Sequence, residues 1–248
     1  MLKVLLFFER VINGLKLFQK IDIKMGSLKA LALSLSSMNN SLVLLKYGIR
    51  LSTILDVGAN IGQFALSASF CFPDAVIYSF EPIPDAFIRL TKNIRGKPQI
   101  KAFNCALGNT RRRTSFYRNE FTQVSSLYKI DHRNDNPNYN QRKTTLVEVD
   151  VFPLDDFVAD LQIKTPILLK MDVQGMEKEV LLGSKRTLEV TEFILVEAPF
   201  IPLYENQLLF DDLNDYMKSI GYKLLAPIGV NRGKDDMIIE MDLLYRKA

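Results

Sequence analysis

Cysteine and histidine are scarce in this chain, whose 248 residues include two cysteines and one histidine. Cys71 and Cys105 form no C-x-x-C pair and have no histidine beside them. This spacing indicates neither a disulfide framework nor a zinc site, and it fits a reducing compartment. With a single histidine, a metal centre would have to be built almost wholly from carboxylates, so we expect no catalytic metal.

Long uncharged apolar runs are also lacking. No stretch reaches the roughly 18 residues that a membrane-spanning helix needs. The apolar N-terminus is interrupted by Lys3, Glu9 and Arg10, and no clean small-residue cleavage site follows it, so a signal peptide is not indicated. We therefore expect a cytoplasmic protein.

A surface of one charge is missing as well. The net charge is +4, but residues 1–50 hold eight basic and two acidic side chains, so the remaining chain is slightly acidic. Such a chain offers no broad polyanion-binding surface, and nucleic acid is not an expected partner. Arg111, Arg112, Arg113 and Arg118 form a local basic cluster, which we interpret as a solvated turn.

Apolar runs alternate with helical patterns from Thr53 onward, which predicts βαβ units around a parallel sheet. We expect strands at 53–57, 75–80, 100–106, 167–171 and 193–197, and helices at 62–71, 84–95, 176–190 and 207–220. Segments 222–225 and 237–245 predict a final antiparallel pair, and 113–117 and 145–151 predict extra strand pieces. The predicted fold class is a doubly wound, mostly parallel α/β sheet.

Residues 1–49 are expected to form a helical extension to a catalytic domain at residues 50–248. Residues 2–24 have an apolar stripe at helical spacing, and a second helical stretch covers about 28–46. The first helix either packs on the catalytic domain or a homodimer partner, or makes a peripheral membrane contact. The polar stretch 119–143 predicts a long loop.

The segment LDVGANIGQF joins an apolar strand to a helix through a glycine-rich turn. Gly58 and Gly62 allow a tight turn and a close approach to a ligand. The segment is not a dinucleotide fingerprint, because Asn60 and Gln63 occupy the second and third glycine positions of G-x-G-x-x-G. Asp56 at the strand end suits a sulfonium or ammonium cation better than a pyrophosphate.

Acidic residues close three later strands. Glu81 lies nineteen positions past Gly62, where an acid can accept both hydroxyls of a ribose. Asp172 and Glu197 follow the apolar runs ILLKM and FILV, at the same predicted edge, so both are candidate catalytic bases. Asp172 could instead cap the next helix, and His132 is a weaker candidate base.

These residues resemble a known family. LDVGANIGQF, SFEP, LLKMDVQGMEKEVLLGS and the later LYENQ are similar to the FkbM family of S-adenosylmethionine-dependent methyltransferases, with Ser125–Leu127 and Asp242–Tyr245 as further matches. The resemblance covers about residues 50–246 and implies a seven-stranded sheet, S-adenosyl-L-methionine as cofactor, and O-methylation of sugars or secondary metabolites. Many relatives have Glu where this chain has Gln174.

The resemblance also implies residue roles. Asp56, Gly58, Asn60 and Gly62 would line the methionine part of the cofactor, Glu81 the ribose, and Asn104, Ala106 and Leu107 the adenine. Asp172 would face the transferred methyl group. The expected partner is a small-molecule or saccharide acceptor. The alternatives are a nicotinamide-dependent oxidoreductase and a non-catalytic cofactor-binding scaffold.

Overall fold

The structure is a computed structural model that describes residues 35–119, 125–128, 144–204, 207–233 and 236–248. Three predictions lie outside these residues. They are the amphipathic helix at 2–24, with its membrane or dimer contact, most of the polar stretch 119–143, and His132 within that stretch.

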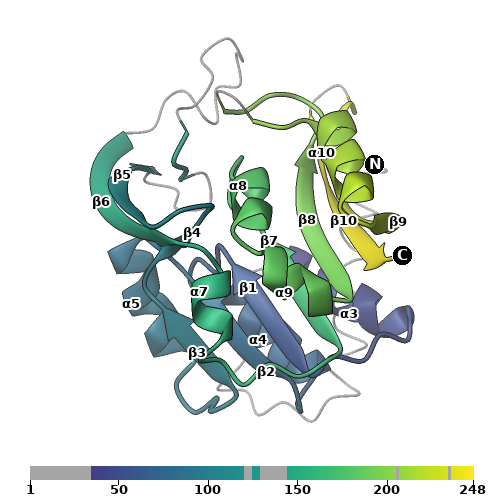
Figure 1. Ribbon diagram of the computed structural model, residues 1–248, viewed down its shortest axis with the longest axis horizontal. Coiled ribbons are helices and arrows are strands. Elements are labelled where there is room, and N and C mark those ends of the chain that lie inside the picture. The colour runs from purple at the N-terminus through teal and green to yellow at the C-terminus, as the bar shows by residue number, and fades with distance from the viewer. Residues whose placement is uncertain (1–34, 120–124, 129–143, 205–206, 234–235) are drawn as a thin grey trace.

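A seven-stranded sheet forms the centre of the molecule (Figure 1). Its strands are β1 (Thr53–Val57), β2 (Val76–Phe80), β3 (Ile100–Phe103), β7 (Ile167–Met171), β8 (Phe193–Pro199), β9 (Tyr222–Arg232) and β10 (Ile238–Lys247). Their order is β3-β2-β1-β7-β8-β10-β9, with β10 antiparallel to both neighbours and the first five strands parallel. The predicted fold class is confirmed. The chain reverses its winding direction between β1 and β7, where doubly wound sheets bind ligands.

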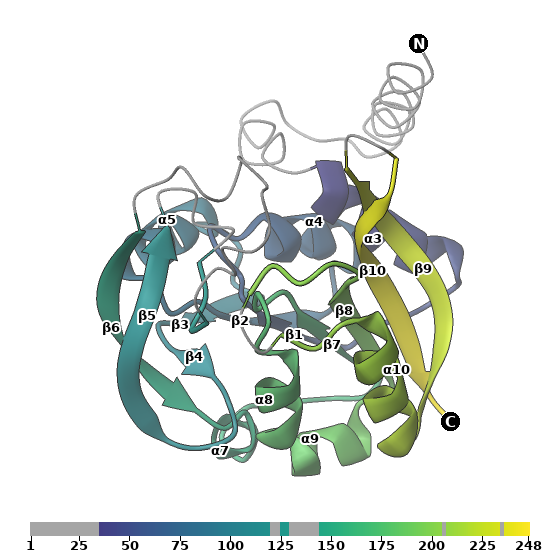
Figure 2. The same ribbon diagram turned by 90° about the horizontal axis from the view of Figure 1, so that it is seen from above.

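Helices cover both faces of the sheet, as Figure 2 shows. One face carries α3 (Leu35–Lys46), α4 (Gln63–Cys71) and α5 (Pro84–Asn93), and the other α7 (Asp155–Val158), α8 (Glu177–Leu182), α9 (Lys185–Val190) and α10 (Phe210–Ser219). Ile54 packs in the cluster beneath α3 and α4, whereas Leu55 and Val57 pack in the opposite cluster. Within the described ranges, no helix has the length and apolar character needed to cross a membrane.

A smaller sheet, ordered β4-β6-β5, lies beside the first. It contains β4 (Ala106–Leu107), β5 (Arg112–Asn119) and β6 (Thr144–Phe152). The single strand predicted at 100–106 is therefore wrong, because the chain leaves the large sheet after Phe103. The side-chain amide of Asn104 donates to the carbonyls of Glu81 and Pro82 at 2.8 and 3.1 Å and holds this turn.

Helix α3 is part of the same core as the sheet, although the sequence places it in the expected N-terminal extension. Met38 and Leu44 are buried with residues of α4, β1 and β9. The amide of Asn39 donates to the Ile228 carbonyl at 3.2 Å, which fastens the helix to β9. The division at residue 49 stays a prediction.

Candidate active site

A cavity of about 520 Å³ lies at the carboxyl ends of the central strands. Its volume is within the roughly 300–1,000 Å³ common for small-molecule sites. The lining includes residues of α3, the loop after β1, the start of α4, the end of β2, β4, β5, the end of β7, β8, β9 and the first half of β10. Predicted site residues in this lining are Gly58, Asn60, Glu81, Ala106, Leu107, Asp172 and Glu197.

The loop after β1 is held by close contacts between chain segments. Gly58 has φ +75°, and a Cβ there would lie 1.9 Å from the Asp172 carbonyl oxygen. At Gly62, φ is +90° and a Cβ would lie 2.7 Å from Leu90 Cδ1. Gly58 is thus required by packing against the backbone at the end of β7, whereas Gly62 is favoured mainly by its positive φ. Gly58 is part of the cavity lining and Gly62 is not, so the expected approach of Gly62 to a ligand stays a prediction.

Glu81 ties this loop to β2. Its Oε2 accepts the Asn60 backbone N–H at 2.7 Å, and its Oε1 accepts the Ile83 N–H at 2.8 Å. Only 4% of Glu81 is exposed. Burial raises the pKa of Glu81 to about 7, against the lowering effect of the two N–H donors. Each carboxylate oxygen keeps a further lone pair. Glu81 can therefore still accept hydrogen bonds from the two ribose hydroxyls, as predicted.

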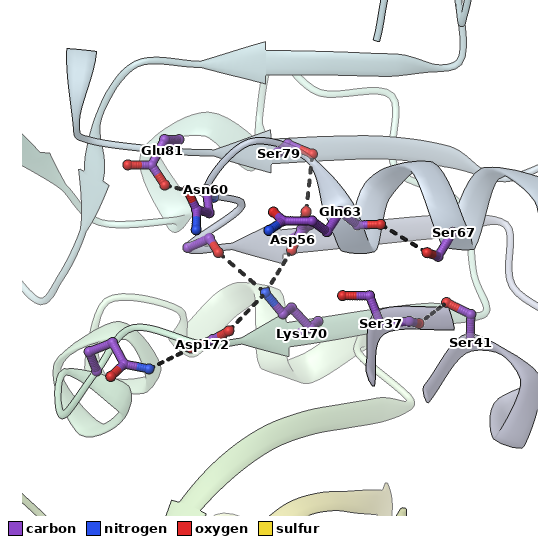
Figure 3. Close-up of polar contacts among 12 residues, drawn as sticks. Ser37, Ser41, Asp56, Asn60, Gln63, Ser67, Ser79, Glu81, Lys170 and Asp172 are labelled. Carbon is purple, nitrogen blue, oxygen red and sulfur yellow. Dashed lines mark hydrogen bonds and ion pairs between the residues drawn. The ribbon is translucent and has the colours of Figure 1, made fainter. Parts of the chain in front are cut away.

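A polar row crosses three strands beneath the cavity (Figure 3). Asp56 is opposite Ser79 on β2 and Lys170 on β7. Its Oδ2 accepts the Ser79 hydroxyl at 3.3 Å, and its Oδ1 lies 3.1 Å from Lys170 Nζ. Asp56 is fully buried and outside the lining. Its carboxylate is directed to Lys170, and the expected place of Asp56 beside the methionine part of the cofactor stays a prediction.

Lys170 extends this row of polar side chains to the cavity lining. No role was predicted for it from the sequence. Its ammonium group donates to the Gly58 carbonyl at 3.3 Å and lies 3.9 Å from Asp172 Oδ2. Burial would lower the pKa of Lys170, but the Asp56 and Asp172 carboxylates outweigh it and raise the pKa above its ordinary value. A lysine inside the otherwise apolar strand ILLKM was the sequence signal for this role.

Asp172 and Glu197 lie together, as predicted, and Gln174 joins them. The Gln174 amide nitrogen donates to Asp172 Oδ1 at 2.8 Å and to Glu197 Oε2 at 2.9 Å. Burial, followed by the Asp172 charge, raises the pKa of Glu197 well above its ordinary value. The alternative role of Asp172 as a helix cap is not observed, because α8 has Met176 at its N-cap.

The far end of the cavity is acidic. Asp242 is directly opposite Glu197 in the β8–β10 pairing, and Glu240 is two residues away on the same face. Burial raises the pKa of both β10 acids, and the neighbouring carboxylates add to this rise. The Asn40 amide donates to Asp242 Oδ2 at 3.0 Å. No group of three or more metal-ligating side chains in the described residues is arranged to hold an ion.

The near end of the cavity is largely apolar. Ala106 and Leu107 line it, together with Ile83, Phe116 and Leu127. Asn104 does not, since it is exposed and its amide holds the turn after β3. The expected contact of Asn104 with the adenine stays a prediction.

The chain is similar to known methyltransferases. The model of the family described as Methyltransferase FkbM domain matches residues 56–224, more than half of the chain. The chain is 28% identical over 183 residues to the 2-O-methyltransferase NoeI of Sinorhizobium fredii, covering 71% of this chain and 75% of that protein. It is 30% identical over 185 residues to Methyltransferase 1 of Beauveria bassiana, covering 69% and 72%.

A third relative is the hexuronic acid methyltransferase AglP of Haloferax volcanii, 28% identical over 143 residues, with 57% of this chain and 54% of that protein covered. The matched span contains Gly58, Glu81, Asp172 and Glu197, which meet at one cavity. The match to this family identifies the chain as a methyltransferase and excludes the alternative oxidoreductase. The chain belongs to the FkbM family of S-adenosylmethionine-dependent methyltransferases.

Proposed function

We propose that this enzyme methylates a hydroxyl group of a sugar or of another small hydroxylated metabolite. The relatives named for 2-O-methylation and for methylation of hexuronic acid support this acceptor class. The observation that carries the proposal is the pair of carboxylates, Asp172 and Glu197, bridged by one amide at the cavity wall. Such a pair can both orient a hydroxyl and accept its proton.

The chemical character of the lining supports one orientation of bound S-adenosylmethionine. Ala106 and Leu107, at the apolar end, would pack against the adenine, and Glu81 would accept the ribose hydroxyls. The loop carrying Gly58 and Asn60 would border the methionine part. When bound, the cofactor supplies an electrophilic methyl group on a sulfonium, and the acidic end of the cavity suits that positive charge.

We assign the role of base to Glu197. A raised pKa means that the ionised carboxylate binds a proton more tightly than an ordinary Glu, which favours removal of a hydroxyl proton. Asp172, one residue past the end of β7, would hold the acceptor oxygen in line with the methyl group. Orientation of this kind supplies on the order of 7 kcal/mol in favourable systems.

Two conservative variants test the proposal. Asp172→Asn and Glu197→Gln should each lower turnover strongly, by roughly 100-fold or more, while calorimetry shows S-adenosylmethionine binding close to wild type. Turnover is measured as transfer of labelled methyl groups to a panel of monosaccharides and small hydroxylated metabolites.

Asp215→Asn is the matched control, because Asp215 is an exposed acid that pairs only with Lys218 among the ion pairs of the described residues. It should leave turnover unchanged. Wild-type turnover in both Asp172→Asn and Glu197→Gln would discard the acid–base role, and an enzyme that methylates amines but no hydroxyl in the panel would discard the acceptor class.

A further inference from the structure

The Gln174 side chain uses all its amide hydrogens on the two proposed catalytic carboxylates. One N–H donates to Asp172 Oδ1 at 2.8 Å and the other to Glu197 Oε2 at 2.9 Å. At the opposite end of the amide, Oε1 accepts the Tyr204 hydroxyl at 2.8 Å. The spacing of the acid pair therefore depends on which way this amide points.

The orientation of the amide is coupled to the protonation of Glu197. An ionised carboxylate only accepts hydrogen bonds, so it requires the Gln174 N–H groups. A protonated Glu197 could instead donate to Oε1, which would favour the amide turned by 180°. The Tyr204 hydroxyl, by donating to Oε1, stabilises the orientation that serves ionised carboxylates.

Both partners of this contact are held rigidly. Tyr204 is 2% exposed, and its backbone N–H donates to Gln207 Oε1 at 3.2 Å. Gln174 has φ +53°, a left-handed conformation that is costly for a residue other than glycine. Its carbonyl accepts the Ser126 hydroxyl at 2.6 Å, which helps to hold that conformation. The hydroxyl and the amide thus meet in a frame built from three separate segments.

We propose that Tyr204 is a positioning residue for methyl transfer, and that its hydroxyl fixes the Gln174 amide so that Asp172 and Glu197 stay aligned beside the β1 loop. This inference rests on the proposed roles of the two carboxylates. It assigns no contact between Tyr204 and either substrate.

Tyr204→Phe removes one hydroxyl and tests the proposal. We expect kcat to fall roughly 10- to 100-fold, the fold-change that corresponds to an unsatisfied buried hydrogen-bond partner. S-Adenosylmethionine affinity should stay within about twofold, since Tyr204 lies outside the cavity lining.

The pH profile separates positioning from general destabilisation. Glu197 is faced by Asp172 after β7, Glu177 on α8, and Glu240 and Asp242 on β10, all acidic. Without the Tyr204 hydroxyl, the Gln174 N–H groups hold ionised Glu197 less firmly, so its pKa rises further. The acid limb of kcat against pH should therefore move to higher pH in Tyr204→Phe.

Tyr222→Phe is the matched control. Its hydroxyl is equally buried and donates to the Thr191 and Leu188 carbonyls at 2.8 and 3.1 Å, away from the cavity. It should lower the stability of the fold and leave the pH profile in place. An equal shift of the profile in both variants would overturn the proposal.

A double-variant cycle tests whether Tyr204 acts through the amide. Gln174→Met keeps a similar volume and cannot donate to the carboxylates, so adding Tyr204→Phe to it should cause no further loss of kcat. Additive losses would overturn the proposal. If Asp172→Asn and Glu197→Gln lose turnover while Tyr204→Phe does not, the inference alone fails. If none of the three loses turnover, the proposed function fails.

Discussion

At the scale of single residues, the charge of Lys170 stabilises the fold by compensating a buried carboxylate. It lies 3.1 Å from fully buried Asp56 and is itself 8% exposed. Removing one partner of a buried ion pair leaves the other uncompensated, at a cost of about 3–5 kcal/mol. We therefore expect Lys170→Met to lower the free energy of unfolding by that amount in chemical denaturation.

The double variant Lys170→Met with Asp56→Leu is the control for this prediction. It removes both charges, and it should recover much of the stability that Lys170→Met loses. A double variant less stable than Lys170→Met would contradict this account of the pair.

Glu177 predicts a pH dependence of stability. Its burial raises its pKa to about 7, against the lowering effect of backbone N–H donors such as that of Gly175, at 3.1 Å. The folded pKa thus lies above the unfolded value, so the folded state binds more protons between pH 4.5 and about 7. This stabilising contribution is complete below the unfolded pKa and is lost as pH rises through the folded pKa.

Glu177→Gln tests that sign. We expect the unfolding free energy of wild type to fall between pH 5 and pH 7.5 and the fall to be smaller in Glu177→Gln, by up to about 3 kcal/mol. Urea denaturation at the two pH values measures the difference. Equal slopes in both proteins would show that Glu177 has an ordinary pKa.

Three of the predicted residues that line the cavity share a position. Gly58, Glu81 and Asp172 each come one residue after their strand ends, at the edge of the sheet where the cavity lies. Asp56 lies inside β1 between β2 and β7, so its side chain meets partners in the sheet. Strand ends could be predicted from apolar runs, but the partners of a buried acid could not, because they depend on register.

At the scale of elements, the β1 loop packs directly on the end of β7. An added Cβ at Gly58 would lie 1.9 Å from the Asp172 carbonyl oxygen, whereas at Gly48, which also has positive φ, nothing lies within 4 Å. Gly48→Ala should therefore cost only the left-handed strain, about 1–2 kcal/mol.

Gly58→Ala should be far more damaging, because the loop must move away from β7. We expect little folded protein by circular dichroism and no measurable S-adenosylmethionine binding. If Gly58→Ala and Gly48→Ala were equally stable, the close approach of loop and strand would be disproved.

Most elements could be predicted from periodicity and turn residues. The strands expected at 53–57 and 167–171 are observed with those bounds, because each is a short buried run closed by a turn. The helix expected at 176–190 is instead two helices, α8 and α9, separated at Gly183 and Ser184. A local pattern does not reveal such breaks, since they follow from packing against other segments.

At the scale of the whole molecule, the charge of the cavity predicts acceptor preference. Its described lining holds five carboxylates and one ammonium, that of Lys170, which is already paired with Asp56. Each of these carboxylates that is ionised repels an anionic acceptor. We expect neutral or amine-bearing sugars to have kcat/KM values roughly tenfold or more above those of the matching uronic acids.

Assays with a glucoside, a glucosaminide and a glucuronide would measure this preference. Asp242→Asn should raise kcat/KM for the glucuronide, and so reduce the difference in kcat/KM between the glucuronide and the other two sugars. A wild-type preference for the glucuronide would contradict the electrostatic argument, and would align this chain with the hexuronic acid methyltransferase to which it is similar.

The acidic end was beyond prediction because distant segments build it. Asn40 on α3 and Asp242 on β10 are 202 positions apart and meet through a 3.0 Å hydrogen bond. Both lie outside residues 56–224, which match the family, whereas Glu81, Asp172 and Glu197 lie inside it. The matched segment therefore contains three of the acids predicted from the sequence, but not the contact between Asn40 and Asp242.

The hydrogen bond between Asn40 and Asp242 also bears on the order in which the cavity is completed during synthesis. A polypeptide still emerging from the ribosome has its β1 loop and the β7 acid long before residue 242 is translated. The cavity lacks the wall that β10 provides until that strand has been translated. A methyl acceptor can therefore be enclosed only after residue 242 has been translated and β10 has paired with β8.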